Sequence, residues 1–289
     1  MSIGKEQKMK KIAGLMLAAG LFAAQPASAM ESQTFAGDTP EAEAVVSVRV
    51  DDSDPEDGVC TGTAIAPQWV LTARHCVEAA KKPGGSVRAG QGEMQFNYQI
   101  DRWEVAPQGD IALAHTVEEM QIGQFPEVAD AEPVGAVNIY GWSSDGSGGT
   151  TTLPSAKGEV RGESPLALFE APTALDVALQ DGARIQPGDS GGAIFSEGKA
   201  AGVMSAGLFE DPDNPTEEEM TSNAAVAVAP VADQAEWIRS VVSQPEKTPE
   251  ERMPASDGPR AGGFTAAGVA VGLLIAVAAG WVALSRRKS

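Results

Sequence analysis

Three short segments of this sequence hold the residue types that nucleophilic catalysis needs. The segment VLTARHCV places His75 directly before Cys76, and GDIALAHT places Asp110 before an apolar run. The segment PGDSGGAIF places Ser190 between glycines, which let backbone N–H groups point at one spot. A hydroxyl that attacks a carbonyl, an imidazole that takes its proton and a carboxylate that orients the imidazole would together cleave an acyl bond.

The order of these residues along the chain narrows the chemistry. A G-x-S-x-G segment is also typical of α/β-hydrolases, in which the catalytic histidine follows the serine. The two histidines of this chain, His75 and His115, both precede Ser190. Subtilisin-type order would need a catalytic Asp before the histidine and an alternating helical pattern that the sequence lacks. The order His, Asp, Ser is left, and His115, which has no partner motif, is interpreted as a strand or surface histidine.

The elements that would position these residues are strands. Short apolar runs bounded by Gly, Pro, Asp and Asn recur along the chain, which is typical of an all-β sandwich or barrel. One helix is expected late, over Ala232–Val242. The clearest predicted strands are 44–50, 62–67, 69–73, 96–105, 110–116, 136–142, 191–196 and 200–207.

The start of the chain predicts a signal peptide over residues 1–29. Basic residues come first, an apolar core follows, and Ala27-Ser28-Ala29 offers a small-residue cleavage site. The mature chain would then begin at Met30. A buried amphipathic helix is the alternative interpretation of the same residues.

The end of the chain predicts a single membrane anchor. Residues 264–284 are apolar and uncharged, and a helix of about 20 such residues crosses a bilayer. The basic tail, 285–289, would stay cytoplasmic and leave the rest outside the cell, as a single-pass protein of the cell membrane. Residues 243–263 are polar and Pro-rich, as in a stalk. A buried helix is the alternative to the span, and MPASDG, 253–258, resembles a degenerate signal for cell-wall attachment.

Charge and cysteine content limit the partners. The chain holds 21 basic and 40 acidic residues, a net charge of −19, so its surface should repel nucleic acid and anionic lipid heads. Cys60 and Cys76, in an exported segment, suggest one disulfide, with two free thiols as the alternative. No spacing typical of a metal site occurs, and no metal or cofactor is expected.

Six segments, in one order, resemble the trypsin-like serine proteases of chymotrypsin fold. They are GTAIAPQWVLTARHC, GDIALAHT, YGWSSDGSGGTTTLPSAKGEV, PGDSGGAIF, GVMSAG and EWIRSVV. The resemblance covers residues 35–242, within a protease domain of 30–242, and departs from the family at Arg74, where alanine is usual. It implies two six-stranded antiparallel β-barrels with a C-terminal helix. It also implies a serine endopeptidase that acts on proteins or peptides through an acyl-enzyme. The predicted signal peptide and C-terminal span add to this that the protein would be a bacterial, membrane-anchored member.

The same resemblance implies a role for each residue. His75, Asp110 and Ser190 would form the catalytic triad, and the N–H groups of Gly188 and Ser190 would bind the oxyanion. Cys76 would pair with Cys60 beside the histidine. The acid before the nucleophile would hold the serine turn through an ion pair.

The resemblance leaves two possibilities for the residues at the floor of the substrate pocket. An ungapped count from the nucleophile puts Arg184 at the pocket floor, which would favour an acidic substrate side chain. A longer form of the loop would put Gly182 and Ala183 there and favour an apolar or small one. Ser205 and Gly207 would line the cleft; Ser205 would also extend the network at Asp110, or be a plain strand serine.

Two further alternatives concern activation and function. The family activates when a new apolar N-terminus pairs with the acid before the nucleophile, here Asp189. Trimming to Phe35-Ala36-Gly37 would supply such an end, and an internal basic group is the other possibility. A catalytically silent surface module for binding or adhesion, on the same fold, is the alternative function.

Overall fold

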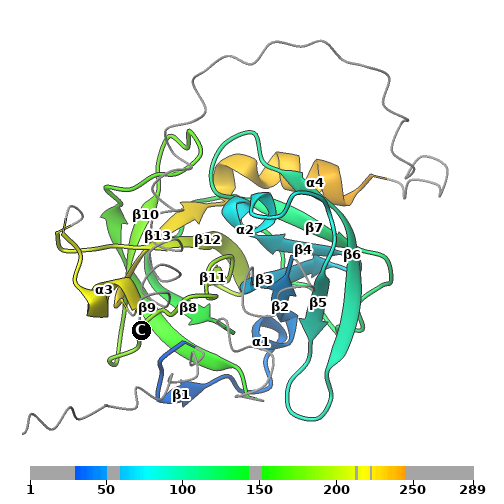
Figure 1. The fold of residues 1–289 in the computed structure, drawn as a ribbon, viewed down its shortest axis with the longest axis horizontal. Helices are drawn as coiled ribbons and strands as arrows, with labels where there is room; N and C mark the ends of the chain where they lie inside the picture. The colour runs from blue at the N-terminus through cyan, green and yellow to red at the C-terminus, as the bar shows by residue number, and fades with distance from the viewer. Residues whose placement is uncertain (1–29, 51–58, 143–151, 212–213, 222, 245–289) are drawn as a thin grey trace, which may run out of the picture. The chain divides into compact units, whose positions relative to one another are not determined.

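The computed structural model describes the central part of the chain (Figure 1). Its described residues are 30–50, 59–142, 152–211, 214–221 and 223–244. The expected signal peptide, membrane span and tail lie outside these residues, and so does the expected stalk from residue 245 on. Within the described part, none of the helices has the length and apolar character that crossing a membrane requires.

Six antiparallel strands close the first barrel, in the order β2-β3-β4-β7-β6-β5. This barrel supplies the histidine and aspartate segments. Its strands are β2 (Val45–Arg49), β3 (Val59–Ala66), β4 (Trp69–Thr72), β5 (Ser86–Ala89), β6 (Phe96–Val105) and β7 (Ala112–Thr116).

The second barrel supplies the serine segment. Its strands run in the order β9-β10-β13-β12-β11-β8, and β8 pairs with β9 to close the ring. They are β8 (Gly135–Tyr140), β9 (Pro154–Glu163), β10 (Leu175–Leu179), β11 (Ala193–Ser196), β12 (Lys199–Gly207) and β13 (Ala225–Pro230). The expected pair of six-stranded antiparallel barrels is therefore confirmed.

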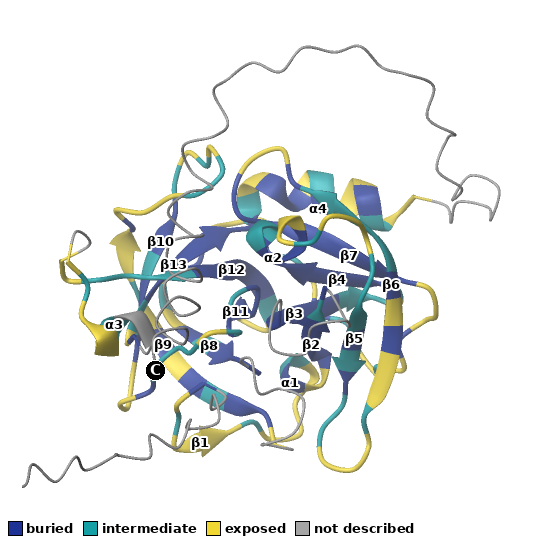
Figure 2. Cartoon of the chain, in the orientation of Figure 1, coloured by how far each residue is buried: buried dark blue, intermediate teal, exposed yellow. Residues whose placement is uncertain are grey.

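Strands nearest the interior are buried along their whole length, as Figure 2 shows for β4 in dark blue. Full burial explains why these segments read as continuous apolar runs rather than as alternating patterns. In β12 the requirement is for small residues: a Cβ on Gly202 would lie 2.5 Å from the Val228 side chain of the neighbouring strand. The sequence AAGVMSAG meets that requirement.

Within the described ranges, five short helical segments connect and cover the barrels. They are α1 (Pro40–Ala44), α2 (Arg74–Glu78), α3 (Glu217–Thr221), the 3₁₀ turn η1 (Ala232–Gln234) and α4 (Ala235–Val242). The expected C-terminal helix is confirmed, with its first turn tightened into η1. Ile238 and Val241 of α4 belong to the same buried cluster as the strands of the first barrel.

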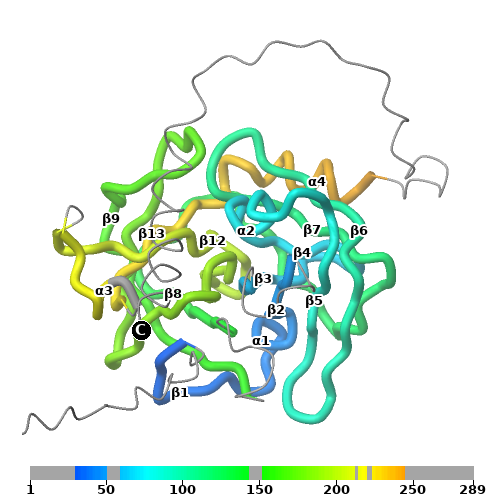
Figure 3. The backbone as a smooth tube through the Cα atoms, viewed as in Figure 1, coloured from blue at the N-terminus to red at the C-terminus, as the bar shows by residue number. Residues whose placement is uncertain are grey.

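The first described residues contact the second barrel, although the strands that follow them form the first barrel. In Figure 3 the first described segment, in blue, runs beside β9 and then enters the first barrel through α1. Strand β1 (Thr34–Phe35) pairs there with Pro154 and Ser155 of β9. The N-terminal segment therefore packs on the barrel that carries Ser190.

Candidate active site

His75 lies on α2, directly after the buried strand β4. The Nδ1 atom of its ring lies 2.7 Å from Asp110 Oδ2. The backbone N–H of His75 donates to Asp110 Oδ1 at 2.9 Å. Because an ionised carboxylate only accepts hydrogen bonds, Nδ1 donates and Nε2 is the acceptor atom of the neutral ring.

Strand register explains why the histidine and aspartate segments meet. Strands β4 and β7 are antiparallel, with Thr72 opposite Ala112. The residues that follow Thr72 therefore lie beside the residues that precede Ala112, and these are His75 and Asp110. Asp110 is only 1% exposed, so water does not compete for its carboxylate.

A disulfide joins Cys60 of β3 to Cys76 of α2, which confirms the expected pairing. Cys76 follows His75, so the bond holds the histidine turn against the barrel. The two sulfurs and a His75 ring nitrogen lie within 4.8 Å of one another. Sulfurs joined in a disulfide are not thiolates, so this cluster offers a metal no cysteine ligand.

Thr61, the residue after Cys60, attaches the serine loop to the first barrel. Its N–H donates to the Ser190 carbonyl at 2.8 Å, and its hydroxyl donates to the Gly188 carbonyl at 2.9 Å. The same hydroxyl accepts the N–H of Trp142 at 3.0 Å. Two consecutive residues of β3 therefore hold both halves of the site.

The turn that carries Ser190 requires glycine where the backbone is left-handed. Gly188 has φ +100° and Gly191 has φ +87°. A Cβ on Gly191 would lie 2.2 Å from Thr72 Oγ1. The N–H of Gly191 donates to the Met204 carbonyl, whereas the N–H groups of Gly188 and Ser190 make no hydrogen bond within the described residues. These two N–H groups are free to bind a substrate oxygen.

Asp189 lies behind the serine and is only 1% exposed. Its Oδ2 accepts the N–H of Gln186 at 2.7 Å. Its Oδ1 packs on Gly141, where a Cβ would lie at 2.2 Å. The glycine before Trp142 is therefore the space that this buried carboxylate occupies.

The Ser190 hydroxyl is not hydrogen-bonded to the histidine. In the described part of the chain, the only partner within reach of His75 Nε2 is Cys76 Sγ, at 3.7 Å. The structure thus joins His75 to Asp110 and brings the Ser190 loop to the same disulfide, since Cys76 Sγ lies 3.9 Å from the Ser190 carbonyl. Contacts of this kind often tighten only when substrate is bound.

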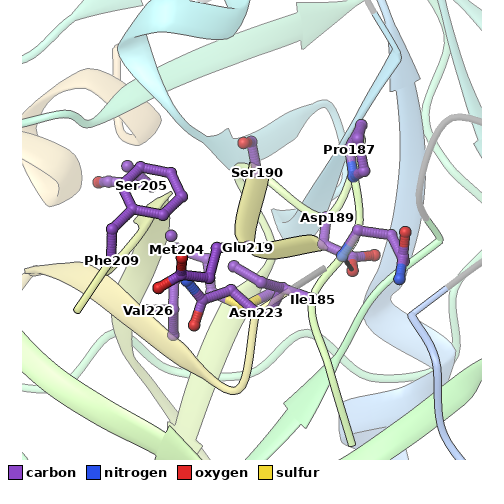
Figure 4. Close-up of a pocket in the computed structure, with 13 residues that line it drawn as sticks. Ile185, Pro187, Asp189, Ser190, Met204, Ser205, Phe209, Glu219, Asn223 and Val226 are labelled. Carbon is purple, nitrogen blue, oxygen red and sulfur yellow. Dashed lines mark hydrogen bonds between the residues drawn. The ribbon is translucent and has the colours of Figure 1, made fainter. Parts of the chain in front are cut away.

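A cavity of about 140 Å³ opens beside Ser190 (Figure 4). Ser205 and Gly207 line it from β12, as the sequence predicts. Arg184 does not line it; its Nη1 lies 3.6 Å from Glu218 Oε1, and its side chain is 40% exposed. The apolar side chains around the cavity are those of Ile185, Pro187, Met204, Ala206, Phe209 and Val226.

Two polar side chains of the cavity, Ser205 and Glu219, differ in their hydrogen bonds. The buried Ser205 hydroxyl has no hydrogen-bond partner among the described residues, so of its two interpretations the link to Asp110 is not formed in this structure. The Glu219 carboxylate accepts hydrogen bonds from the N–H and hydroxyl of Thr216 and from the N–H of Glu210. The Thr216 hydrogen bonds, followed by that from Glu210, lower the pKa of Glu219, which therefore carries a negative charge at neutral pH.

The first described residues reach this region by strand pairing. The N–H and C=O of Glu31 bond to Arg184 at 2.9 and 2.8 Å. In this antiparallel pairing Met30 lies opposite Ile185, and its side chain is 2% exposed in the core of the second barrel. The next residue, Gln186, is the donor to the buried acid.

Phe35, which one of the two activation possibilities would make the new apolar end, lies elsewhere in this structure. It pairs with Pro154 at the edge of β9 and is 52% exposed. Met30, by contrast, belongs to the buried cluster of the second barrel. The sequence predicts Met30 as the first residue after the cleavage site, but no local pattern connects it with the buried acid.

The other histidine is a packed strand residue. His115 lies on β7 and is 1% exposed, with its Nδ1 2.6 Å from Asp101 Oδ1. Its ring meets the edge of Trp69 at 4.8 Å between centroids. The interpretation of His115 as a strand histidine agrees with this position.

Comparison with known proteins gives the family. The family model described as Trypsin matches residues 35–238, and the chain belongs to that family. An uncharacterized peptidase of Corynebacterium glutamicum is 26% identical over 225 residues, which cover 76% of each chain. A trypsin of Tyrophagus putrescentiae, Tyr p 3.0101, is 28% identical over 187 residues, 54% of this chain and 66% of its own.

Solved structures share the fold. Neuropsin, a serine protease from mouse brain, aligns with a TM-score of 0.52 at 21% identity, over 71% of this chain and 96% of its own. Human heparin binding protein aligns with a TM-score of 0.52 at 18% identity, over 75% and 98%. At such identities the likeness concerns the fold alone.

Proposed function

We propose that this protein is an exported, membrane-anchored serine endopeptidase with His75, Asp110 and Ser190 as its catalytic triad. The observation that carries the proposal is the doubly hydrogen-bonded His75–Asp110 pair, at 2.7 and 2.9 Å, on the turn that the disulfide fixes. Membership of the trypsin family supports the reaction class. The reaction needs only the peptide, water and these side chains.

In the first step Ser190 attacks the peptide carbonyl. Nε2 of His75 takes the hydroxyl proton while Oγ forms a bond to the carbonyl carbon. The negative charge that develops on the carbonyl oxygen is bound by the free N–H groups of Gly188 and Ser190. Asp110 keeps the ring oriented and stabilises its charged form.

In the second step the tetrahedral intermediate collapses. His75 gives its proton to the leaving amine, the C–N bond breaks, and an ester to Ser190 stays behind. Water then enters, loses a proton to His75 and releases the acid by the same path in reverse. Both products leave with the enzyme unchanged.

The cavity supports peptides with an apolar side chain before the cleaved bond. Ile185, Met204 and Phe209 supply apolar wall, and the Glu219 carboxylate would repel an acidic side chain. This favours an apolar substrate side chain over an acidic one, since Arg184 faces Glu218 instead. Gly182 and Ala183, which the apolar interpretation placed at the pocket floor, do not line the cavity either. A peptide library varied at that position is expected to show cleavage after Leu, Met or Phe and none after Glu.

A silent binding module is the second candidate, because His75 and Ser190 are not hydrogen-bonded in the structure. One structural neighbour is named for binding heparin, a polyanion. The net charge of −19 makes a similar role unfavourable here, since like charges repel.

Covalent labelling of the exported domain with a fluorophosphonate separates the two candidates. The proposal predicts stoichiometric labelling at Ser190, lost in Ser190→Ala and strongly slowed in His75→Ala. The matched control is Ser196→Ala, a serine on the neighbouring strand β11. A folded, unlabelled wild-type domain would favour the silent module.

Membrane anchoring is tested on the whole chain. We expect the full-length protein in the membrane fraction and a chain ending at Gln244 in the medium. Release of the full-length protein by wall-digesting enzymes, rather than by detergent, would favour wall attachment.

A further inference from the structure

Phe169 contacts the residue before His75 and the residue before Asp110. Its ring lies under the guanidinium of Arg74, the residue before His75, with 4.6 Å from Arg74 Cζ to the ring centroid. Its carbonyl accepts the N–H of Gly109, the residue before Asp110, at 2.9 Å. One residue of the second barrel therefore bridges two segments of the first.

The turn that presents Phe169 has an unusual backbone. Phe169 and Glu170 both have φ +56°, a left-handed conformation that side chains other than glycine rarely adopt. The turn is closed by a hydrogen bond from Ala171 N–H to the Leu168 carbonyl at 3.3 Å. Such conformations persist where surrounding contacts hold them, and they gather at functional sites.

Arg74 is held on two sides. Its Nε donates to Glu78 Oε1 at 2.9 Å, one turn further along α2, and its guanidinium stacks on the Phe169 ring. Arginine is suited to this double role because its planar group can stack and donate together. Its side chain is 24% exposed, so it forms a partly buried link.

We propose that Arg74 and Phe169 are positioning residues that fix the spacing between His75 and Asp110. The proposal rests on the proposed function, since it assigns these residues to the same site. The stack fixes α2 from the outside, and the Phe169 carbonyl fixes the start of the aspartate segment. Together with the disulfide, which holds α2 from the barrel side, they leave the histidine little freedom to move.

Steady-state kinetics with a peptide substrate test the proposal. Arg74→Ala and Phe169→Leu should each lower kcat by about tenfold to a hundredfold, because small misplacements of catalytic groups cost this much. KM should change less than about twofold, since neither residue lines the cavity. Phe169→Tyr keeps an aromatic face and should restore kcat. The double variant should lose little more than either single one, because both remove the same stack.

The matched control is Arg161→Ala. Arg161 is also paired with an acid, Asp176, at 2.6 Å, but it lies on β9 and lines no part of the cavity beside Ser190. Its removal should leave kcat unchanged. Equal kcat in the Arg74 and Arg161 variants, a raised KM with constant kcat, or simple additivity in the double variant would overturn the proposal.

A second readout does not depend on turnover. The proton on His75 Nδ1 is observed by ¹H NMR as a far-downfield signal, and it should broaden or shift in Arg74→Ala but not in Arg161→Ala. A wild-type domain that the fluorophosphonate does not label would contradict the proposed function. A wild-type domain that is labelled, combined with an unchanged NMR signal in Arg74→Ala, would contradict this inference alone.

Discussion

Asp110 shows how much of the site depends on one side chain. Both of its oxygens face His75, one on the ring and one on the backbone N–H. In Asp110→Asn the amide can donate to the ring, which favours the wrong tautomer of His75. We expect kcat to fall by about 10⁴-fold with little change in the thermal midpoint. Peptide hydrolysis and a melting curve measure both.

The control for this variant is Asp101→Asn, at the other histidine–acid pair. That pair lies on β6 and β7, and His115 is opposite Trp69, toward the other end of β7 from Asp110. Hydrolysis should survive this change. A similar loss in both variants would show that stability, not the tautomer, controls the rate.

Tyr140 gives a prediction for alkaline pH. Burial, and next the charge of Glu41, raise the pKa of the Tyr140 phenol from 10.0 to about 12. Because the Tyr140 phenol ionises less readily in the folded state than in the unfolded state, its contribution to the free energy of unfolding is full below pH 10. That contribution is lost as the pH rises from 10 toward 12. Denaturant midpoints measured across this window should fall less steeply in Tyr140→Phe. Parallel curves for both proteins would contradict the assignment.

The sequence indicated the candidate site residues more directly than the contacts that support them. His75, Asp110 and Ser190 stand in distinctive segments, so their proposed roles follow from residue order together with the family resemblance. Thr61 could not be inferred, because its task is a contact between barrels that no local pattern encodes. The role of Phe169 could not be inferred from the sequence either, because its contacts are with segments that are distant along the chain.

Among the structural elements, the turn at Ser190 makes the sharpest stability prediction. Gly191→Ala places a methyl group 2.2 Å from Thr72 Oγ1 and 2.3 Å from the Thr61 carbonyl, in a left-handed backbone. We expect a loss of about 3 kcal/mol or more in the free energy of unfolding, measured by urea denaturation.

Gly198→Ala is the matched control for that turn. Gly198 has φ +81° and open space where the methyl group would go. It should lose only the cost of the left-handed backbone, about 1–2 kcal/mol. Equal losses at the two glycines would show that the close packing of the serine turn against β3 contributes nothing.

Strand prediction succeeded where β-branched and aromatic residues are dense. The predicted strand 96–105 coincides with β6, and 69–73 with β4 apart from its last residue. Strands β1, β5, β9, β10 and β13 are not among the clear predictions. β13 is AVAVAP, and alanine has low strand propensity, so its burial between β10 and β12 becomes visible only in the fold.

For the whole molecule, export and activation become one event if Met30 is the mature N-terminus. Its side chain is buried in the second barrel, and the antiparallel pairing of Glu31 with Arg184 places Met30 opposite Ile185, the residue before Gln186. An amino group released at Met30 would add a positive charge next to the loop that carries Asp189. Mass spectrometry of the exported protein should therefore show Met30 as its first residue.

An extended N-terminus tests the same point. A domain that keeps two extra residues before Met30 should lose most of its activity, whereas two extra residues after Gln244 should have no effect. Full activity of the extended form, or a mature chain that begins at Phe35, would contradict this route.

The most direct test of the whole account is the rate of peptide hydrolysis by the purified domain, compared among Ser190→Ala, His75→Ala and the double variant. Since the two residues act as one unit, each single change should abolish nearly all turnover, and the double change should cost little more. Persistent hydrolysis in Ser190→Ala would mean that some other group attacks the peptide bond, and the assignment of the triad would be wrong.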